Sequence, residues 1–482
     1  PTILKKLTRI GNHIGRQVVS AILAIILVAY PLRSFAHPSE QGFVLLLPTD
    51  FYIATGIATV ALTAAALARL PTTTITFLFS NRTFVGLRHH SWMPTLSSFC
   101  STLVLVVLIL IGLSGSGDPL SNPLSLVIWT VWWTALLFLQ GILGDLWKWI
   151  NPWTGIYDLC IGSNANTPLK LPDRLGNSVG LCGLILFFAF TLADPAPDYP
   201  PRLALVTALY WMATFIGMCL FGRDPWLSRC ECFTMLFRLF ALISGIRTTK
   251  GTCHVGFPGW QIVTSRKSSF SVFALTALAA GSFDGMNETF WWLSQIGVNP
   301  LEFPGRSAVI GQTIGGMIGA IILLHCLFAL CIATGQYLVR KHTGGPLPIS
   351  FSLAFGRLAL SVLPIALGYH FAHYLPAFLV NSQYLVAATN DPLTRGADLF
   401  GLGVFYVTTG FFYTQDTVRV ILLTQCVAIV IGHMIAVLTA HLIALGLYGT
   451  NRQAILSQIP MAVFMILYTL LSLWLLAAPR GA

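Results

Sequence analysis

The sequence predicts an all-α protein, a polytopic membrane bundle of about ten transmembrane helices behind an N-terminal signal-like segment. Only 9% of its 482 residues are charged and 55% are hydrophobic, whereas a soluble domain carries about 25% charged residues. The hydrophobic residues gather in runs of about 18 to 25, long enough for a helix to cross a hydrocarbon core of roughly 30 Å. These runs do not alternate in polarity, which disfavours the strands of a membrane β-barrel.

Residues 1–36 have the pattern of a secretory signal. A basic start that includes Lys5 is followed by an apolar stretch, and the small residues Ser34 and Ala36 fit a cleavage site. We therefore expect a signal peptide whose removal leaves His37 as the first mature residue. The alternative is an uncleaved signal-anchor, and in both cases the chain after this segment starts outside the cytoplasm.

The rest of the chain, 37–482, is expected to form a single transmembrane helical domain, because its loops are too short to hold a soluble one. Ten apolar runs predict ten spans. They lie near 51–70, 95–113, 124–143, 177–193, 203–222, 268–283, 307–338, 358–387, 420–448 and 455–478.

The charged residues give these spans a direction. If the mature chain starts outside, the inner loops and their edges carry 17 Lys and Arg against 5 on the outer side, and the other 5 belong to the signal region. Cytoplasmic loops are enriched in Lys and Arg. We therefore predict a bacterial-type inner membrane protein with both mature ends outside the cytoplasm. The net charge of +11 is explained by this topology and does not indicate a nucleic-acid partner.

The largest inner loop, 223–267, is strongly basic. Within it, Cys232–Ile246 is apolar but too short to span comfortably, so we expect a helix on the membrane surface. A basic edge beside such a helix predicts contact with anionic lipid.

Two further patterns are interpreted as structural. Three tryptophans of the second inner loop are typical of an interfacial aromatic belt: Trp147, Trp149 and Trp153. Three glycines spaced by four in the seventh span predict close helix packing: Gly311, Gly315 and Gly319.

Histidines are the ionisable residues that this pattern places deep in the spans, since all 16 Asp and Glu fall in predicted loops or at helix ends. The histidines lie in the seventh, eighth and ninth spans: His325, His370, His373, His433 and His441. Ionisable groups inside a membrane are candidates for function. The first four could bind a haem b or a transition metal, since imidazole ligates iron, copper and zinc. Alternatively they relay protons, contact a substrate, or hydrogen-bond across helix interfaces.

A second group of soft ligands lies in the largest inner loop. Cys230, Cys232, Cys253 and His254 offer thiols and an imidazole to a zinc or copper ion. The spacing is not the usual C-x-x-C, and reduced, unliganded thiols are the alternative. A mature amino terminus at His37 would offer its amine and imidazole to copper.

An outer segment after the sixth span combines acids, an amide and paired tryptophans. Asp284, Asn287 and Glu288 follow Gly281, and Gly285 lies among them, so we expect an interrupted helix there. Such a segment could line the entrance of a substrate path, with His441 near its inner end. An aromatic belt with a re-entrant turn is the alternative.

Many spans, short loops and no nucleotide-binding motif favour a transporter or permease for a small solute or ion, with a histidine-lined path in the C-terminal half. The main rival is a membrane redox subunit that holds a haem b or metal, within an assembly of further membrane subunits. An intramembrane enzyme is disfavoured, because no paired carboxylates or activated nucleophile lie at mid-depth. The chain resembles no family that would decide between these functions.

Overall fold

The computed structural model describes residue 44 and residues 46–85, 90, 92–162, 168–249, 251–265, 268–346 and 349–480. The predicted signal segment and the copper site at His37 lie outside these residues. Within them, nine helices are long and apolar enough to cross a membrane, which confirms a multi-pass helical protein. They are α3 (Thr49–Leu67), α5 (Trp92–Ser114), α6–η1–α7 (Pro123–Leu143), α11 (Pro200–Phe221), η3–α15 (Ser268–Asn287, in which α15 is Ser271–Asn287), α17 (Ile310–Thr343), α18–η6–α19 (Phe351–Asn390, in which α19 is Leu363–Asn390), α20 (Gln415–Tyr448) and α21 (Asn451–Ala477).

Shorter elements connect these helices. They are α4 (Thr72–Leu78), β1 (Asn81–Val85), α8 (Trp147–Ile150), α9 (Thr154–Cys160), η2 (Asp173–Leu175), α10 (Ser178–Ala193), α12 (Arg223–Arg229), α13 (Cys232–Ala241), β2 (Ile246–Thr249), β3 (Thr252–Gly256), α14 (Trp260–Thr264), α16 (Phe290–Gln295), η4 (Pro300–Glu302), η5 (Arg306–Ala308) and η7 (Gly410–Phe412). The predicted fourth span is α10, whose 16 residues extend only about 24 Å at 1.5 Å per residue. It is therefore shorter than a typical span.

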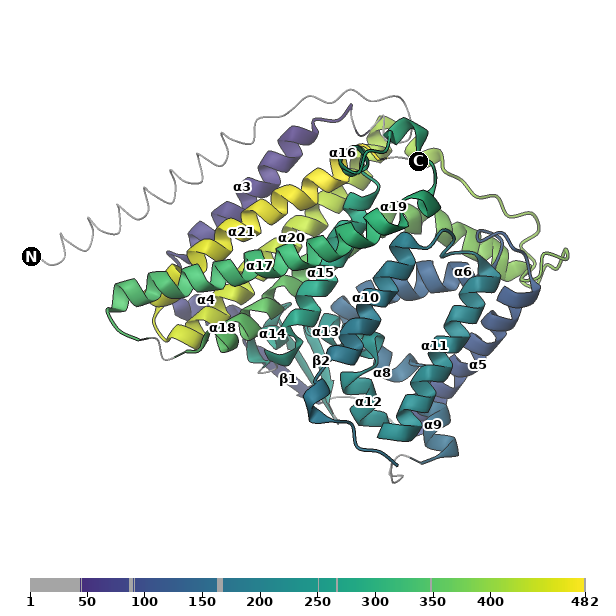
Figure 1. Ribbon diagram of the computed structural model, residues 1–482, viewed down its shortest axis with the longest axis horizontal. Helices are drawn as coiled ribbons and strands as arrows, with labels where there is room; N and C mark the ends of the chain where they lie inside the picture. Colours follow the sequence, from purple (N-terminus) through teal and green to yellow (C-terminus); the bar gives the residue numbers. More distant parts are fainter. Residues whose placement is uncertain are drawn as a thin grey trace, which may run out of the picture.

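Figure 1 shows α3, α21, α20 and α17 side by side, and each contacts at least one of the others. Helices α19 and α20 cross in close contact at two glycines. A Cβ added to Gly368 would lie 2.5 Å from the Ala428 carbonyl oxygen, and one added to Gly432 would lie 2.5 Å from that of Pro364. The two backbones are thus in direct contact, which fixes the histidines of both helices relative to one another.

A small sheet marks the end of the bundle that charge predicts to be inner. Its strand order is β1–β3–β2, with both pairs antiparallel. We call this the inner end, and we call the end that carries α16 and Arg480 the outer end (Figure 1). The sequence analysis predicted no strands here.

Helix α13 corrects the prediction of a surface helix. Nine of its ten residues are buried, and Arg238 is the exception. The aromatic residues of the second inner loop are also in the core: Trp147 and Trp153 are each 4% exposed, and the Trp147 ring stacks on Phe237 at 4.7 Å. An interfacial belt is therefore wrong for these two tryptophans. Contact of the basic loop with anionic lipid stays a prediction.

The glycine stripe of α17 is also corrected. A Cβ added to Gly311, Gly315 or Gly319 would meet nothing within 4 Å among the described residues. The close contact is made instead by Gly335, where an added Cβ would lie 2.3 Å from the Ser457 carbonyl oxygen of α21.

Substitution of Gly335 and of Gly315 tests whether Gly335 makes the close contact of α17 with α21. We expect Gly335→Ala to destabilise the protein by about 1–3 kcal/mol, because the added methyl meets backbone that cannot move aside. Gly315→Ala is the matched control in the same helix and should be neutral or slightly stabilising, because alanine favours a helix. The midpoint of thermal unfolding in detergent, followed by size-exclusion chromatography, measures both. Equal midpoints for the two variants would contradict the assigned packing.

Candidate functional site

The site begins with the sequence Tyr369-His370-Phe-Ala-His373-Tyr374 in α19. Side chains four residues apart on a helix are neighbours, so the motif makes two ring pairs. Tyr369 and His373 stack with centroids 5.8 Å apart, and His370 and Tyr374 lie 4.8 Å apart. All four side chains line one cavity in the interior of the protein.

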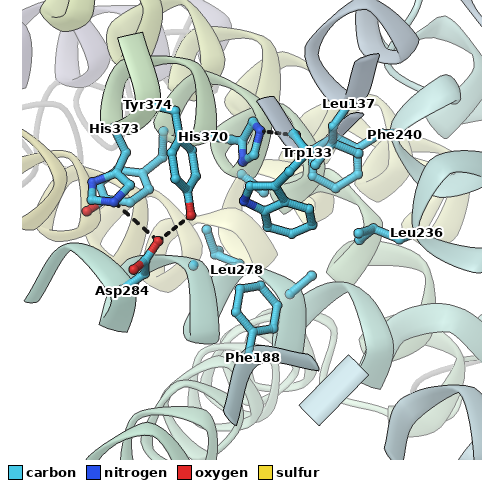
Figure 2. Close-up of a pocket in the computed structure, with 14 residues that line it drawn as sticks. Trp133, Leu137, Phe188, Leu236, Phe240, Leu278, Asp284, His370, His373 and Tyr374 are labelled. Atoms are coloured by element: carbon cyan, nitrogen blue, oxygen red, sulfur yellow. Dashed lines mark hydrogen bonds and ion pairs between the residues drawn. The ribbon is translucent and has the colours of Figure 1, made fainter. Parts of the chain in front are cut away.

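Asp284 of α15 faces the second half of this motif (Figure 2). The Tyr374 hydroxyl donates to Asp284 Oδ2 at 2.6 Å, and His373 Nε2 lies 3.2 Å from the same oxygen. The side chains of Asp284 and His373 are only 19% and 10% exposed. A carboxylate this buried needs such partners to offset its lost hydration. We call Asp284, His373 and Tyr374 the acid cluster.

His370 points toward a different helix from His373, although the two share a cavity. Its Nε2 lies 2.9 Å from the carbonyl oxygen of Trp133, so in this geometry Nε2 carries the proton and donates. Trp133 lies in η1 (Val127–Leu136), a ten-residue π-helix. π-Helical turns are rare and frequent at functional sites. Figure 2 shows Trp133 beside His370 and Tyr374.

Two cavities meet at the acid cluster. The inner chamber is lined by apolar groups such as Leu236, Phe240 and Leu278, and its volume is about 30 Å³. The vestibule reaches toward the outer end and has a volume of about 460 Å³. Four residues line both cavities: Trp133, Asp284, His373 and Tyr374. Trp133 and the acid cluster therefore form the partition between the vestibule and the inner chamber.

The vestibule wall combines charges with aromatic rings. Asp198 and Glu288 line it near the outer end, together with Arg306, which pairs with Glu288 at 3.4 Å and donates to the Thr191 carbonyl oxygen at 3.1 Å. The rings that line it belong to Trp129, Trp133, Tyr374 and Phe378. A cavity of this size with a few polar groups among aromatic ones is typical of a small-molecule site.

Helix α15 corrects the predicted interruption at its glycines. It runs without a break through both of them to Asn287. Gly281 lines the inner chamber and has nothing within 4 Å of an added Cβ, whereas at Gly285 an added Cβ would lie 1.7 Å from Tyr369 Oη. Because Gly285 has no side chain, the Tyr369 ring can pack directly against α15. Gly285 does not end the helix.

The predicted substrate-path residues are only partly brought together. Asp284 and Glu288 line the vestibule. Asn287 turns to α17, where its Oδ1 accepts from the Thr313 hydroxyl at 3.3 Å. His441 lies in α20, is 4% exposed and lines neither the vestibule nor the inner chamber. Asn287 and His441 are therefore not part of the vestibule.

The four predicted haem or metal histidines do not form one group. His370 lines the inner chamber and His373 lines both cavities, but His325 and His433 line neither. His325 Nδ1 lies 2.8 Å from the Ile321 carbonyl oxygen and His433 Nδ1 lies 2.9 Å from that of Ile429, each within its own helix. The inner chamber is also far too small for a haem. The residues present do not fit this cofactor.

The predicted zinc or copper ligands of the inner loop are also separated. Cys230 and Cys232 flank the start of α13, whereas Cys253 and His254 lie on β3, where His254 Nδ1 is 3.1 Å from the Thr83 hydroxyl. Across the part of the chain that the structure describes, no three His, Cys, Asp or Glu side chains are grouped to hold a metal ion.

The residue between the two cysteines was missed by the sequence analysis. Glu231 is 1% exposed, accepts from the backbone amides of Phe233 and Thr234, and bonds the Tyr210 hydroxyl. Burial raises the pKa of the Glu231 carboxyl, while its hydrogen bonds act in the opposite direction. It caps the N-terminus of α13 and so anchors this helix inside the bundle.

The fold and this site define a multi-pass membrane protein with a buried acid–imidazole–phenol cluster at the floor of an outer vestibule. No family model, no curated protein and no solved structure matches the chain.

Proposed function

We propose that this protein is a membrane permease that moves a small polar solute through the vestibule and past the acid cluster. The observation that carries the proposal is the position of Asp284, a buried carboxylate held by His373 and Tyr374 in the wall between two cavities. Ionisable residues inside membrane bundles commonly mark substrate or ion pathways.

The geometry suggests how solute binding is linked to movement of the helices. A solute that contacts Asp284 competes with His373 and Tyr374 for the same carboxylate. These partners lie on α19 and Asp284 lies on α15, so this competition loosens the contact between the two helices. The inner chamber has a volume of only about 30 Å³, so passage inward requires α15, α19 and η1 to separate. Such gating of one bundle against another is the usual basis of alternating access.

A location in a bacterial-type inner membrane, with both mature ends outside the cytoplasm, belongs to the same proposal and rests on the distribution of basic residues. Further membrane subunits stay a prediction.

Reconstitution tests the proposal. The purified protein in liposomes is assayed for uptake and counterflow of a panel of radiolabelled small solutes, including organic cations, neutral polyols, amino acids and carboxylates, with empty liposomes as the control. The proposal predicts saturable, protein-dependent uptake of at least one solute. Absence of uptake across the panel by a folded protein would overturn it. A Soret band that is lost in His370→Ala would instead favour the redox subunit.

A further inference from the structure

We infer that the vestibule takes a small organic cation that carries one hydrogen-bonding group, such as an amino alcohol. This inference rests on the proposed function for the role of the vestibule in transport. Binding of a cation in the vestibule can, however, be measured without transport.

The charges that line the vestibule favour a cation. Three carboxylates line it, Asp198, Asp284 and Glu288, against one guanidinium, Arg306. Arg306 is paired with Glu288. The charge of Asp284 is offset by His373, when that ring is protonated, and in part by the positive charge of Arg480. Among the described residues, Asp198 has no cationic partner within 4.0 Å. Asp198 is exposed to solvent, so the outer part of the vestibule is left with a hydrated carboxylate that no neighbouring cation in the described part of the chain neutralises.

The aromatic lining favours an organic cation over a hydrated metal ion. Trp129, Trp133 and Phe378 line the same cavity as the carboxylates. Alkylammonium groups bind to the faces of such rings, and tryptophan gives the strongest attraction. A small metal cation would instead require several oxygen ligands at short distances, and the described residues show no such grouping.

Two polar groups of the vestibule wall have no hydrogen-bond partner in the part of the chain that the structure describes. The Thr130 side chain is 3% exposed, lines the vestibule, and its hydroxyl has no hydrogen-bond partner among the described residues. The buried indole N–H of Trp129 next to it also lacks one. An unpartnered buried donor is costly. Both groups would be satisfied by a hydroxyl or carbonyl on the bound cation.

A matched pair of ligands tests this directly. Choline and 3,3-dimethyl-1-butanol have the same shape and hydroxyl, but only choline is charged. Binding is measured by isothermal titration to the full-length protein in detergent, with ethanolamine and butyrate as further probes. We expect choline or ethanolamine to bind at least about tenfold more tightly than the neutral alcohol and butyrate.

The variant Asp198→Asn should weaken cation binding by about tenfold or more, since it removes the uncompensated charge. Asp416→Asn is the matched control, because Asp416 is a carboxylate with an 88% exposed side chain that does not line the vestibule. Thr130→Val should weaken choline binding but leave that of tetramethylammonium, which lacks the hydroxyl, unchanged.

The outcomes separate this inference from the permease proposal. Equal or tighter binding of the neutral alcohol or of butyrate would overturn the cation site, and so would the absence of binding by every probe. Cation binding that depends on Asp198, without any uptake in liposomes, would support the site and overturn the permease.

Discussion

Asp284→Asn is expected to lower the initial rate of solute uptake into liposomes by at least about tenfold, the loss that follows when one charge-assisted interaction of roughly 1.4 kcal/mol or more is removed. Asparagine has the shape of aspartate, but it has no negative charge and cannot take up a proton. Its amide can still accept from the Tyr374 hydroxyl, which bonds Asp284 at 2.6 Å. The variant should therefore fold, and its defect should be confined to transport.

Asp416→Asn is again the control, since it removes a carboxylate at the exposed start of α20 whose one side-chain partner among the described residues is Arg419. Its uptake should match that of the unmodified protein. Size-exclusion profiles and thermal midpoints of both variants establish that they are folded. If Asp284→Asn takes up solute at the unmodified rate, the acid cluster is not on the transport path.

Gly285→Ala is expected to reduce both stability and uptake. The added Cβ would lie 1.7 Å from Tyr369 Oη and 3.0 Å from its Cζ, so the ring must leave its place. Tyr369 is 3% exposed and stacks on His373, and its displacement therefore also disturbs the partner of Asp284. Overpacking of this kind costs about 1–3 kcal/mol.

Two further variants show whether a clash with the Tyr369 hydroxyl causes the loss of stability. Gly281→Ala is the matched control in the same helix, where an added Cβ meets nothing within 4 Å. Adding Tyr369→Phe to Gly285→Ala removes the atom that clashes most and should recover much of the lost thermal stability. A double-mutant cycle measures this coupling. Purely additive effects would contradict the close approach of Tyr369 to Gly285.

The membrane class and most span boundaries were predictable from sequence, because each span depends on the local concentration of apolar residues. The structure ends α15 at Asn287, one turn beyond the predicted boundary at 283. That turn determines whether Asp284 belongs to a loop or to the bundle. The residues of that turn, Asp284, Gly285, Met286 and Asn287, are mostly polar or glycine, so composition alone places them in a loop.

His370, His433 and His441 are buried, whereas His325 and His373 are half-buried. The partners of these histidines could not be predicted from sequence. His373 is paired with Asp284 and His370 with the Trp133 carbonyl, and both contacts join residues at least 89 positions apart in sequence (373 − 284). The π-helix that carries Trp133 has no local pattern that distinguishes it from an α-helix. The burial of α13 was missed for a related reason, since a short apolar helix satisfies the same pattern on a membrane surface or within a core.

Protection of a thiol at the floor of the vestibule tests most directly the claim that the solute binds at the acid cluster on its way through the protein. A single cysteine replaces Ala377, which lines the vestibule, in a protein whose ten native cysteines are changed to serine or alanine. Its labelling by a membrane-impermeant maleimide is followed with and without the transported solute. We predict that the solute slows labelling and that Asp284→Asn abolishes this protection. Equal protection in both backgrounds would show that solute binds without the acid cluster and would contradict the proposed path.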